Sequence, residues 1–225
     1  MKGQLDCIIG GPPCQAFSVY NHQRGMHEKR TGLFRKYLRL IKEILPKCLV
    51  LENVPGMNSV ENGAAISEIK NVLVSLGYKV EMKILNAEDF GLAQERRRLF
   101  FLASRLKSAI EFPKPFCGDG KLPFLTVWDS ISDLPKLNNR EGGEEFKYPI
   151  KPQNQFQQKI RDQSSMIFNH VAPTLGQINL ERLKHIPEGG SWRDIPNHLL
   201  PDDIKRAKRS DHTKRYGRLS KNGFA

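Results

Sequence analysis

The sequence is poor in cysteine and has no long apolar run, and both shortages exclude classes of protein. The four cysteines, at positions 7, 14, 48 and 117, form no CxxC pair, which argues against a disulfide framework or a zinc site. The six histidines include no HxxxH pair, so we expect no metal centre. No run approaches the roughly 18 apolar residues of a membrane span, and no signal-peptide pattern opens the chain. We therefore expect a cytoplasmic protein, without a membrane span, whose cysteines are free thiols.

Positive charge is in excess. The chain has 36 Lys and Arg against 24 Asp and Glu, a formal net charge of +12. Residues 205–221 hold eight of these basic residues against one acid, Asp211. Such a cluster suits the phosphate backbone of a nucleic acid, although a solvated lysine-rich surface explains a basic segment equally well. Charge alone therefore does not decide the partner.

The first hundred residues alternate between apolar strands and amphipathic helices. The pattern predicts strands at 5–10, 48–51, 80–84 and 99–103 and helices at 33–45 and 65–76. Pro46 and Gly77 are expected to end the two helices. This order is typical of an α/β fold with a doubly wound parallel sheet, in which ligands gather at the carboxyl ends of the strands.

The pattern changes after residue 104. Prolines recur at 113, 115, 123, 135, 149 and 152, and long regular elements disappear. One short helix is predicted at 126–129, where Thr126 and Asp129 fit a capping box. We interpret residues 105–215 as a second, irregular region.

A stiff loop follows the first strand and carries Cys14. The sequence of residues 10–18 is GGPPCQAFS, in which two glycines and two prolines fix a non-repetitive backbone. An isolated cysteine is more often a small buried hydrophobe than a nucleophile. The rigid loop at a strand end reverses that preference, because a structural cysteine does not need it. Cys14 is therefore a candidate nucleophile.

Further polar groups lie at other strand ends. Glu52 ends the second strand, where a carboxylate is costly unless it is paired or used, and an acid that simply faces water is the alternative. Because neighbouring strand ends lie side by side, Glu52 can approach Cys14. Gln94, Arg96 and Arg98 should share one face of an extended chain and present two guanidinium groups to phosphate or base oxygens. A soluble edge would explain the same basic run.

Taken together, these segments resemble the DNA cytosine-5 methyltransferase family in its bacterial form. The resemblance covers nearly the whole chain and follows the order of the family. The matching segments are GGPPCQAFS (10–18), RTGLF (30–34), ENV (52–54), LNAEDFGLAQERRRLF (85–100), ERLKHIPEGGSWRDIP (181–196) and RSDHTKRYGRL (209–219). PCQ and ENV alone are moderately specific, whereas the ordered set is highly specific.

The resemblance implies a partial Rossmann-like, S-adenosylmethionine-dependent methyltransferase sheet with an irregular target-recognition region. Residues 1–104 would form part of the catalytic domain, and residues 105–215 would form the target-recognition region. Residues 216–225 would begin a return to the catalytic domain. In the family, the recognition region reads DNA sequence with side chains in the major groove.

The resemblance also implies a mechanism. The Cys14 thiolate would add to C6 of a cytosine flipped out of double-stranded DNA, and C5 would then take a methyl group from S-adenosylmethionine. Glu52 would contact the ring N3 and the exocyclic amine. Arg96 and Arg98 would hold the base and a nearby phosphate, and this electropositive setting would favour the thiolate.

Other residues would contact the substrate. By resemblance these are Gln15, Ser18 and Gln94, and the segment 19–31 is similar to the family's mobile loop that closes over DNA. A plain surface connection is the alternative for that segment. The implied enzyme is a DNA-associated methylase of a restriction-modification system, with no metal.

The chain departs from the family at both ends. The glycine-rich turn that receives the cofactor has no counterpart here, so the cofactor-binding residues stay unassigned. The only GxG, at residues 118–120, lies in a proline-flanked loop and not between a strand and a helix. We therefore expect an incomplete fragment. The alternatives are half of a split enzyme whose partner chain supplies the cofactor half, and a non-catalytic DNA-binding remnant. An RNA methyltransferase of the same fold and an unrelated thiol enzyme agree less well with the motifs.

Overall fold

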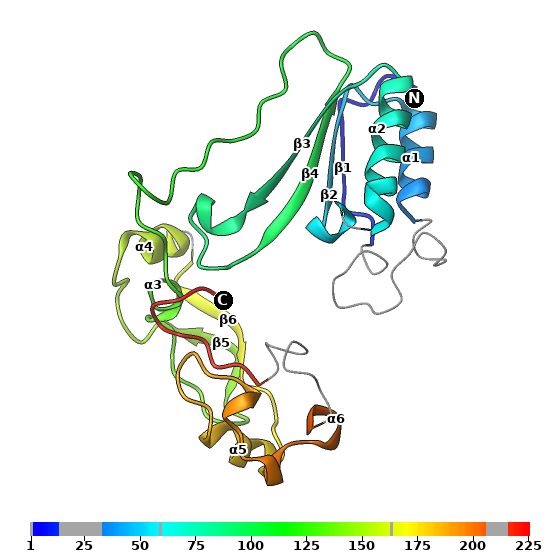
Figure 1. Cartoon of the computed structure of the whole chain (residues 1–225). Coiled ribbons are helices and arrows are strands. Elements are labelled where there is room, and N and C mark those ends of the chain that lie inside the picture. Colours follow the sequence, from blue (N-terminus) through cyan, green and yellow to red (C-terminus); the bar gives the residue numbers. More distant parts are fainter. Residues whose placement is uncertain (1, 14–32, 59, 163, 206–215) are drawn as a thin grey trace. The chain divides into compact units, whose positions relative to one another are not determined.

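The computed structural model describes residues 2–13, 33–58, 60–162, 164–205 and 216–225 (Figure 1). It divides into two compact units. The first comprises Met1–Phe90 and Arg96–Phe116, and the second comprises Gly91–Glu95 and Cys117–Ala225. The division therefore falls after Phe116 rather than after residue 104, and residues 216–225 belong to the second unit. The functional labels given to these regions stay predictions.

A four-stranded mixed sheet forms the centre of the first unit. Its strands, in spatial order, are β1 (Cys7–Gly10), β2 (Cys48–Asn53), β4 (Arg97–Ser104) and β3 (Lys79–Asn86). β1 is parallel to β2, whereas β4 is antiparallel to both of its neighbours. The prediction of a wholly parallel sheet is therefore wrong at β4. The link between β3 and β4, residues 87–96, is shorter than the crossover of about a dozen residues that parallel neighbours need.

Both predicted helices are present, and they cover one face of this sheet. They are α1 (Leu33–Ile44) and α2 (Ala64–Ser75), and Figure 1 shows both on the same side. Their buried residues pack against alternate residues of β2 and β4; this core includes Phe34, Leu38, Ile41, Leu49, Leu51, Ile69, Leu73, Leu99 and Phe101. Gly77, at φ 83°, lets the chain turn after α2, and the amide N–H of Tyr78 donates to the carbonyl oxygen of Leu73.

The opposite face of the sheet is open and carries apolar residues on β1, β2 and β4, whereas β3 places Glu81 and Lys83 on it. Ile9, Val50 and Leu102 lie side by side across three strands, and Phe100 lies beside Glu52. Ile9 is 79% exposed. Sheets of α/β proteins normally have both faces covered. Among the described residues of the first unit, no α-helix lies on this face.

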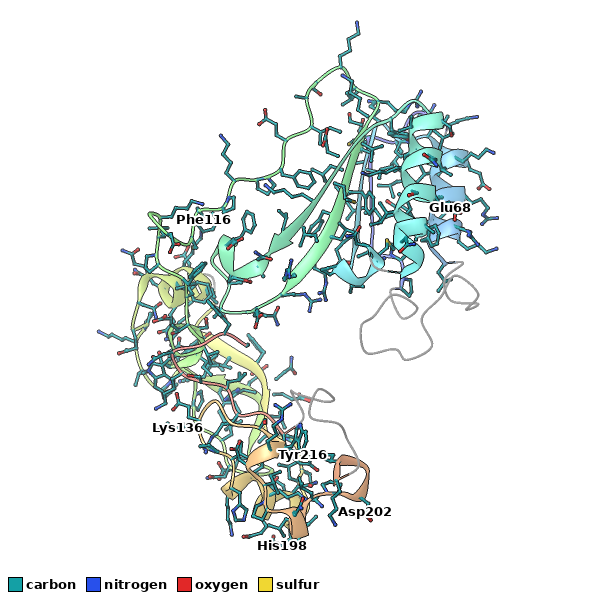
Figure 2. All side chains as sticks on the ribbon, viewed as in Figure 1. Glu68, Phe116, Lys136, His198, Asp202 and Tyr216 are labelled. Atoms are coloured by element: carbon teal, nitrogen blue, oxygen red, sulfur yellow. The ribbon has the colours of Figure 1, made fainter. Side chains whose placement is uncertain are left out.

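The second unit is built from short elements. These are α3 (Val127–Ile131), β5 (Gly142–Lys147), α4 (Gln155–Arg161), β6 (Met166–Val171), α5 (Gln177–Lys184) and α6 (Asp202–Lys205). The predicted capping box is confirmed: the hydroxyl oxygen of Thr126 accepts from the amide N–H of Asp129, and the Asp129 carboxylate accepts from the amide N–H of Thr126. β5 and β6 form an antiparallel pair that the sequence did not predict. Tyr216, labelled in Figure 2, packs against a small core around Trp192.

A buried ion pair in the second unit joins the end of α4 to the turn that follows α3. The Arg161 guanidinium contacts the Asp133 carboxylate, and their side chains are only 9% and 4% exposed. The same guanidinium lies 3.6 Å from the centre of the Tyr148 ring and donates to the carbonyl oxygen of Ile150 at 2.8 Å. Burial leaves each charge dependent on its partner.

Asp133→Asn is expected to destabilise the second unit by about 3–5 kcal/mol, because it leaves the Arg161 charge buried without an anion. Urea unfolding followed by tryptophan fluorescence reports this unit, since both tryptophans of the chain, Trp128 and Trp192, belong to it. Glu181→Gln is the matched control. It removes the exposed Lys184–Glu181 pair and should leave the midpoint unchanged, because water screens that pair. Equal shifts in the two variants would contradict the prediction.

Candidate active site

The ends of β1 and β2 meet at one edge of the sheet. Gly10 pairs with Leu51, so the chain leaves β1 beside the last residues of β2. A Cβ atom built on Gly11 would lie 3.1 Å from Oε2 of Glu52. The backbone that leads into the predicted nucleophile loop thus runs against the Glu52 carboxylate. Cys14 itself lies outside the described residues, as do Gln15, Ser18 and the segment 19–31.

Glu52 is paired with a guanidinium from the neighbouring strand. Nε of Arg98, on β4, lies 2.7 Å from Oε1 of Glu52, and the two side chains are 24% and 36% exposed. Nη1 of Arg98 also donates to the carbonyl oxygen of Arg97 at 2.9 Å. Oε1 is thereby held by Arg98, while Oε2 lies toward Gly11. The pair gives a strand-end carboxylate the partner that it needs, and it fixes the direction in which that carboxylate points.

Gln94 and Arg96 are not part of the strand that carries Arg98. β4 begins at Arg97, so the extended strand starts later than the alternation of Gln94, Arg96 and Arg98 required. Arg96 is exposed, and its carbonyl oxygen accepts from the Ala87 amide at 3.0 Å. Gln94 lies in a bend of the second unit. Within the first unit, the structure brings Arg98 to Glu52.

Two residues that the sequence analysis did not select also reach this edge. Asn53 is 1% exposed, and its Nδ2 donates to the carbonyl oxygen of Pro12 at 3.1 Å. The ring of Tyr37, on α1, occupies the space where a Cβ of Gly10 would lie. Asn53 stands in the ENV segment, which was the available signal. No signal in the sequence pointed to Tyr37, apart from its place among the apolar positions of a predicted helix.

The remaining thiols do not belong to this edge. Cys7 and Cys48 are free and face each other across β1 and β2. Burial and a hydrogen bond with Cys48 raise the pKa of the Cys7 thiol above its ordinary value, which makes it a poor nucleophile near neutral pH. Within the described ranges, no group of three or more potential ligands could hold a metal ion. None of the described helices is both long enough and apolar enough to cross a membrane.

The mixed sheet, covered by helices on one face and carrying its polar groups at the strand ends, defines an α/β protein of the methyltransferase fold class. A solved structure supports this class: a candidate DNA modification methyltransferase encoded within an E. coli prophage, with a TM-score of 0.67 and 24% identity. That comparison covers 98% of this chain and 61% of the solved one. At this identity the likeness concerns the fold alone.

The family follows from the sequence match. This chain belongs to the family of C-5 cytosine-specific DNA methylases, whose family model matches residues 1–222. The Type II methyltransferase M.DdeI of Desulfomicrobium norvegicum is 35% identical over 199 residues, which are 85% of this chain and 47% of the relative. M1.HphI of Haemophilus parahaemolyticus is 34% identical over 200 residues, 88% of this chain and 47% of the relative. The chain thus spans about half the length of these curated relatives.

Proposed function

We propose that the protein to which these residues belong methylates C5 of cytosine in double-stranded DNA, as a methylase of the restriction-modification type. The observation that carries the proposal is the Glu52 carboxylate, held by Arg98 and lying against Gly11, three residues before Cys14. Membership of the DNA methylase family and similarity to Type II methyltransferases support it.

The proposed chemistry begins with a flipped cytosine between Cys14 and Glu52. The thiolate sulfur forms a bond to C6, which makes C5 nucleophilic enough to accept a methyl group. Glu52 contacts the ring N3 and the exocyclic amine and stabilises the charge that develops as the sulfur adds. Water acting as the base then takes the C5 proton, the C5=C6 double bond re-forms, and the sulfur leaves C6 with its electron pair as the thiolate. Arg98 acts on the base from beside Glu52, and Arg96 holds a nearby phosphate.

The remaining predicted residues have supporting roles. Gln15, Ser18 and Gln94 contact the flipped nucleotide, and residues 105–215 recognise the target sequence. Flipping is required because the C5 and C6 atoms cannot be attacked by protein groups while the base stays stacked in the duplex. The basic residues of 205–221 suit the DNA backbone, so binding should weaken as salt rises.

S-adenosylmethionine would supply the methyl group, but the described residues do not make a site for it. Ile9, Val50 and Leu102, on the open face beside β1, are apolar and offer no partner for a ribose or a carboxylate. The GxG at residues 118–120 forms a turn closed by the Cys117–Leu122 bridge, and no helix starts there. We therefore assign the cofactor site to sequence outside the residues described.

The test of this function is direct methylation. The chain, joined to or mixed with a family segment that carries the cofactor site, is incubated with duplex DNA and methyl-labelled S-adenosylmethionine. We expect label in 5-methylcytosine, identified by mass spectrometry of the digested nucleosides. Label in RNA alone would favour the RNA-directed alternative, and salt-dependent DNA binding without any label would favour the non-catalytic remnant.

The open face favours a complementary segment, in the same polypeptide or in a partner chain, that completes the sheet. An exposed apolar edge strand is a ready template for another strand, and Ile9 lies at that edge. A covering layer would bury Ile9 together with Val50, Phe100 and Leu102. The missing cofactor site and the uncovered face then have one explanation.

Ile9→Lys is expected to weaken assembly with a separately supplied cofactor segment by at least about tenfold, because it places a charge in an apolar contact. Calorimetric titration measures the effect. The chain alone should not bind S-adenosylmethionine at micromolar levels, and the mixture should bind it. Val74→Lys is the control, because Val74 is 60% exposed on α2, on the helix side of the sheet. Micromolar binding by the chain alone would overturn this proposal.

A further inference from the structure

Three consecutive backbone positions at the root of the nucleophile loop are held by three different side chains. The Tyr37 ring packs on Gly10, the Glu52 carboxylate lies against Gly11, and the Asn53 amide binds the carbonyl oxygen of Pro12. Glu52 already has a place in the proposed chemistry. Asn53 and Tyr37 have none, although they contact the same stretch of chain.

The Asn53 contact is a polar anchor of the kind that the two prolines can accept. Pro12 and Pro13 have no amide N–H, so residues 12 and 13 can be held by hydrogen bonds only through their carbonyl oxygens. A donor must therefore come from elsewhere, and Nδ2 of Asn53 supplies it at 3.1 Å. Oδ1 of Asn53 accepts from the Val54 amide at 2.9 Å. That second bond fixes which end of the side-chain amide faces Pro12.

Tyr37 ties the far end of the loop to its root. The helix α1 is the first described element after Pro13, and its Tyr37 lies against Gly10, where the chain leaves β1. The Tyr37 hydroxyl donates to the carbonyl oxygen of Val50 at 3.2 Å. Burial raises the pKa of Tyr37 well above its ordinary value, so the hydroxyl keeps its proton and stays a donor. A side chain at position 10 would collide with the ring.

We propose that Asn53 and Tyr37 are positioning residues that fix the backbone at residues 10–12 and thereby the direction in which Cys14 is presented to the base. This inference rests on the proposed function. It requires that losing either contact slows the addition of the sulfur to C6 and leaves the affinity for DNA in place. Misplacement of a reacting group by about 1 Å costs on the order of 100-fold in rate.

The test uses Asn53→Asp, which keeps the size of the side chain and removes the Nδ2 donor. The complete enzyme, with its cofactor segment, is mixed with saturating duplex DNA that contains 5-fluorocytosine. The rate of covalent adduct formation is followed in a single turnover, and the DNA dissociation constant is measured separately by fluorescence anisotropy. We expect the adduct rate to fall about 10–100-fold and the dissociation constant to change less than about threefold. Asn71→Asp makes the same substitution at an exposed position of α2 and should leave both unchanged.

Variants of Tyr37 test the same inference independently. They suffice on their own if a thermal melt shows that Asn53→Asp does not fold. Tyr37→Phe keeps the ring against Gly10 and should hold the wild-type adduct rate within about threefold, whereas Tyr37→Ala should lose about tenfold or more. A wild-type rate in either folded variant, Asn53→Asp or Tyr37→Ala, would overturn the inference, as would a loss confined to DNA affinity. If the wild-type enzyme forms no adduct, the proposed function fails instead.

Discussion

Cys14→Ser is expected to abolish the covalent adduct with DNA that contains 5-fluorocytosine. The attacking species is a thiolate, and a serine hydroxyl is hardly ionised near neutral pH, so no comparable anion is present to add to C6. Fluorine at C5 prevents the proton loss that normally precedes release, and the wild-type adduct therefore persists. Loss of a catalytic nucleophile costs other covalent enzymes on the order of 10⁴-fold or more. Methyl transfer to ordinary cytosine should fall on that scale.

The measurement is a shift of the protein band on a denaturing gel, confirmed by the mass of the adduct. Cys7→Ser is the matched control, because it makes the same change on β1 in a thiol whose raised pKa leaves it mostly protonated. It should form the adduct at the wild-type rate. An adduct that survives in Cys14→Ser, or that is lost in Cys7→Ser, would remove Cys14 from its assigned role.

The strands and helices of the first unit were predictable because their apolar residues repeat with the period of each element. The core positions of α1 and α2 recur three and four residues apart, and β3 alternates. The direction of β4 was not predictable in the same way, since composition is the same for a strand in either direction. It follows from the length of the link after β3, which the sequence does show and which points to a hairpin.

The second unit was less predictable from the sequence because its elements are short and their pairing partners are distant in the sequence. β5 has one large apolar residue, Phe146, and becomes a strand by pairing with β6 some twenty residues later. A strand of that composition is stabilised by its cross-strand neighbours rather than by its own pattern. α4 and α5 have at most eight residues each, fewer than a periodic pattern needs to be distinguished from a loop.

In the candidate site, too, local features were predictable and contacts between distant residues were not. Glu52 could be selected from sequence because a carboxylate at the end of an apolar strand is costly, but its partner could not. Arg98 was expected to hold base or phosphate oxygens, and the structure shows it on Glu52. The partner of Asn53 could not be predicted from the sequence either. The contact of Asn53 with Pro12 joins residues 41 positions apart, and no local pattern contains such a contact.

Glu52→Gln is expected to lower methyl transfer at saturating DNA by about 10²–10⁴-fold, the usual range for a positioned acid–base or charge-stabilising side chain. Oε1 faces the Arg98 guanidinium at 2.7 Å and Oε2 faces the loop root. An amide in this place must turn its NH₂ either toward Arg98, which is itself only a donor, or toward the base, where the proposed contact with a protonated N3 needs an acceptor. Single-turnover transfer of labelled methyl measures the rate. Arg97→Ala, beside the pair but exposed, should leave that rate near the wild-type value.

The pairing of Glu52 with Arg98 allows a stricter test than either single variant. If Arg98 acts mainly by holding Glu52, then Arg98→Ala should slow transfer in the wild-type background and have little further effect in Glu52→Gln, because groups that act as a unit are not additive. A full, independent loss from Arg98→Ala in the Glu52→Gln background would show that the guanidinium acts on the substrate directly. The double-mutant cycle thus distinguishes two roles of Arg98, namely orienting the Glu52 carboxylate and contacting the base directly. The geometry of the pair is compatible with each role.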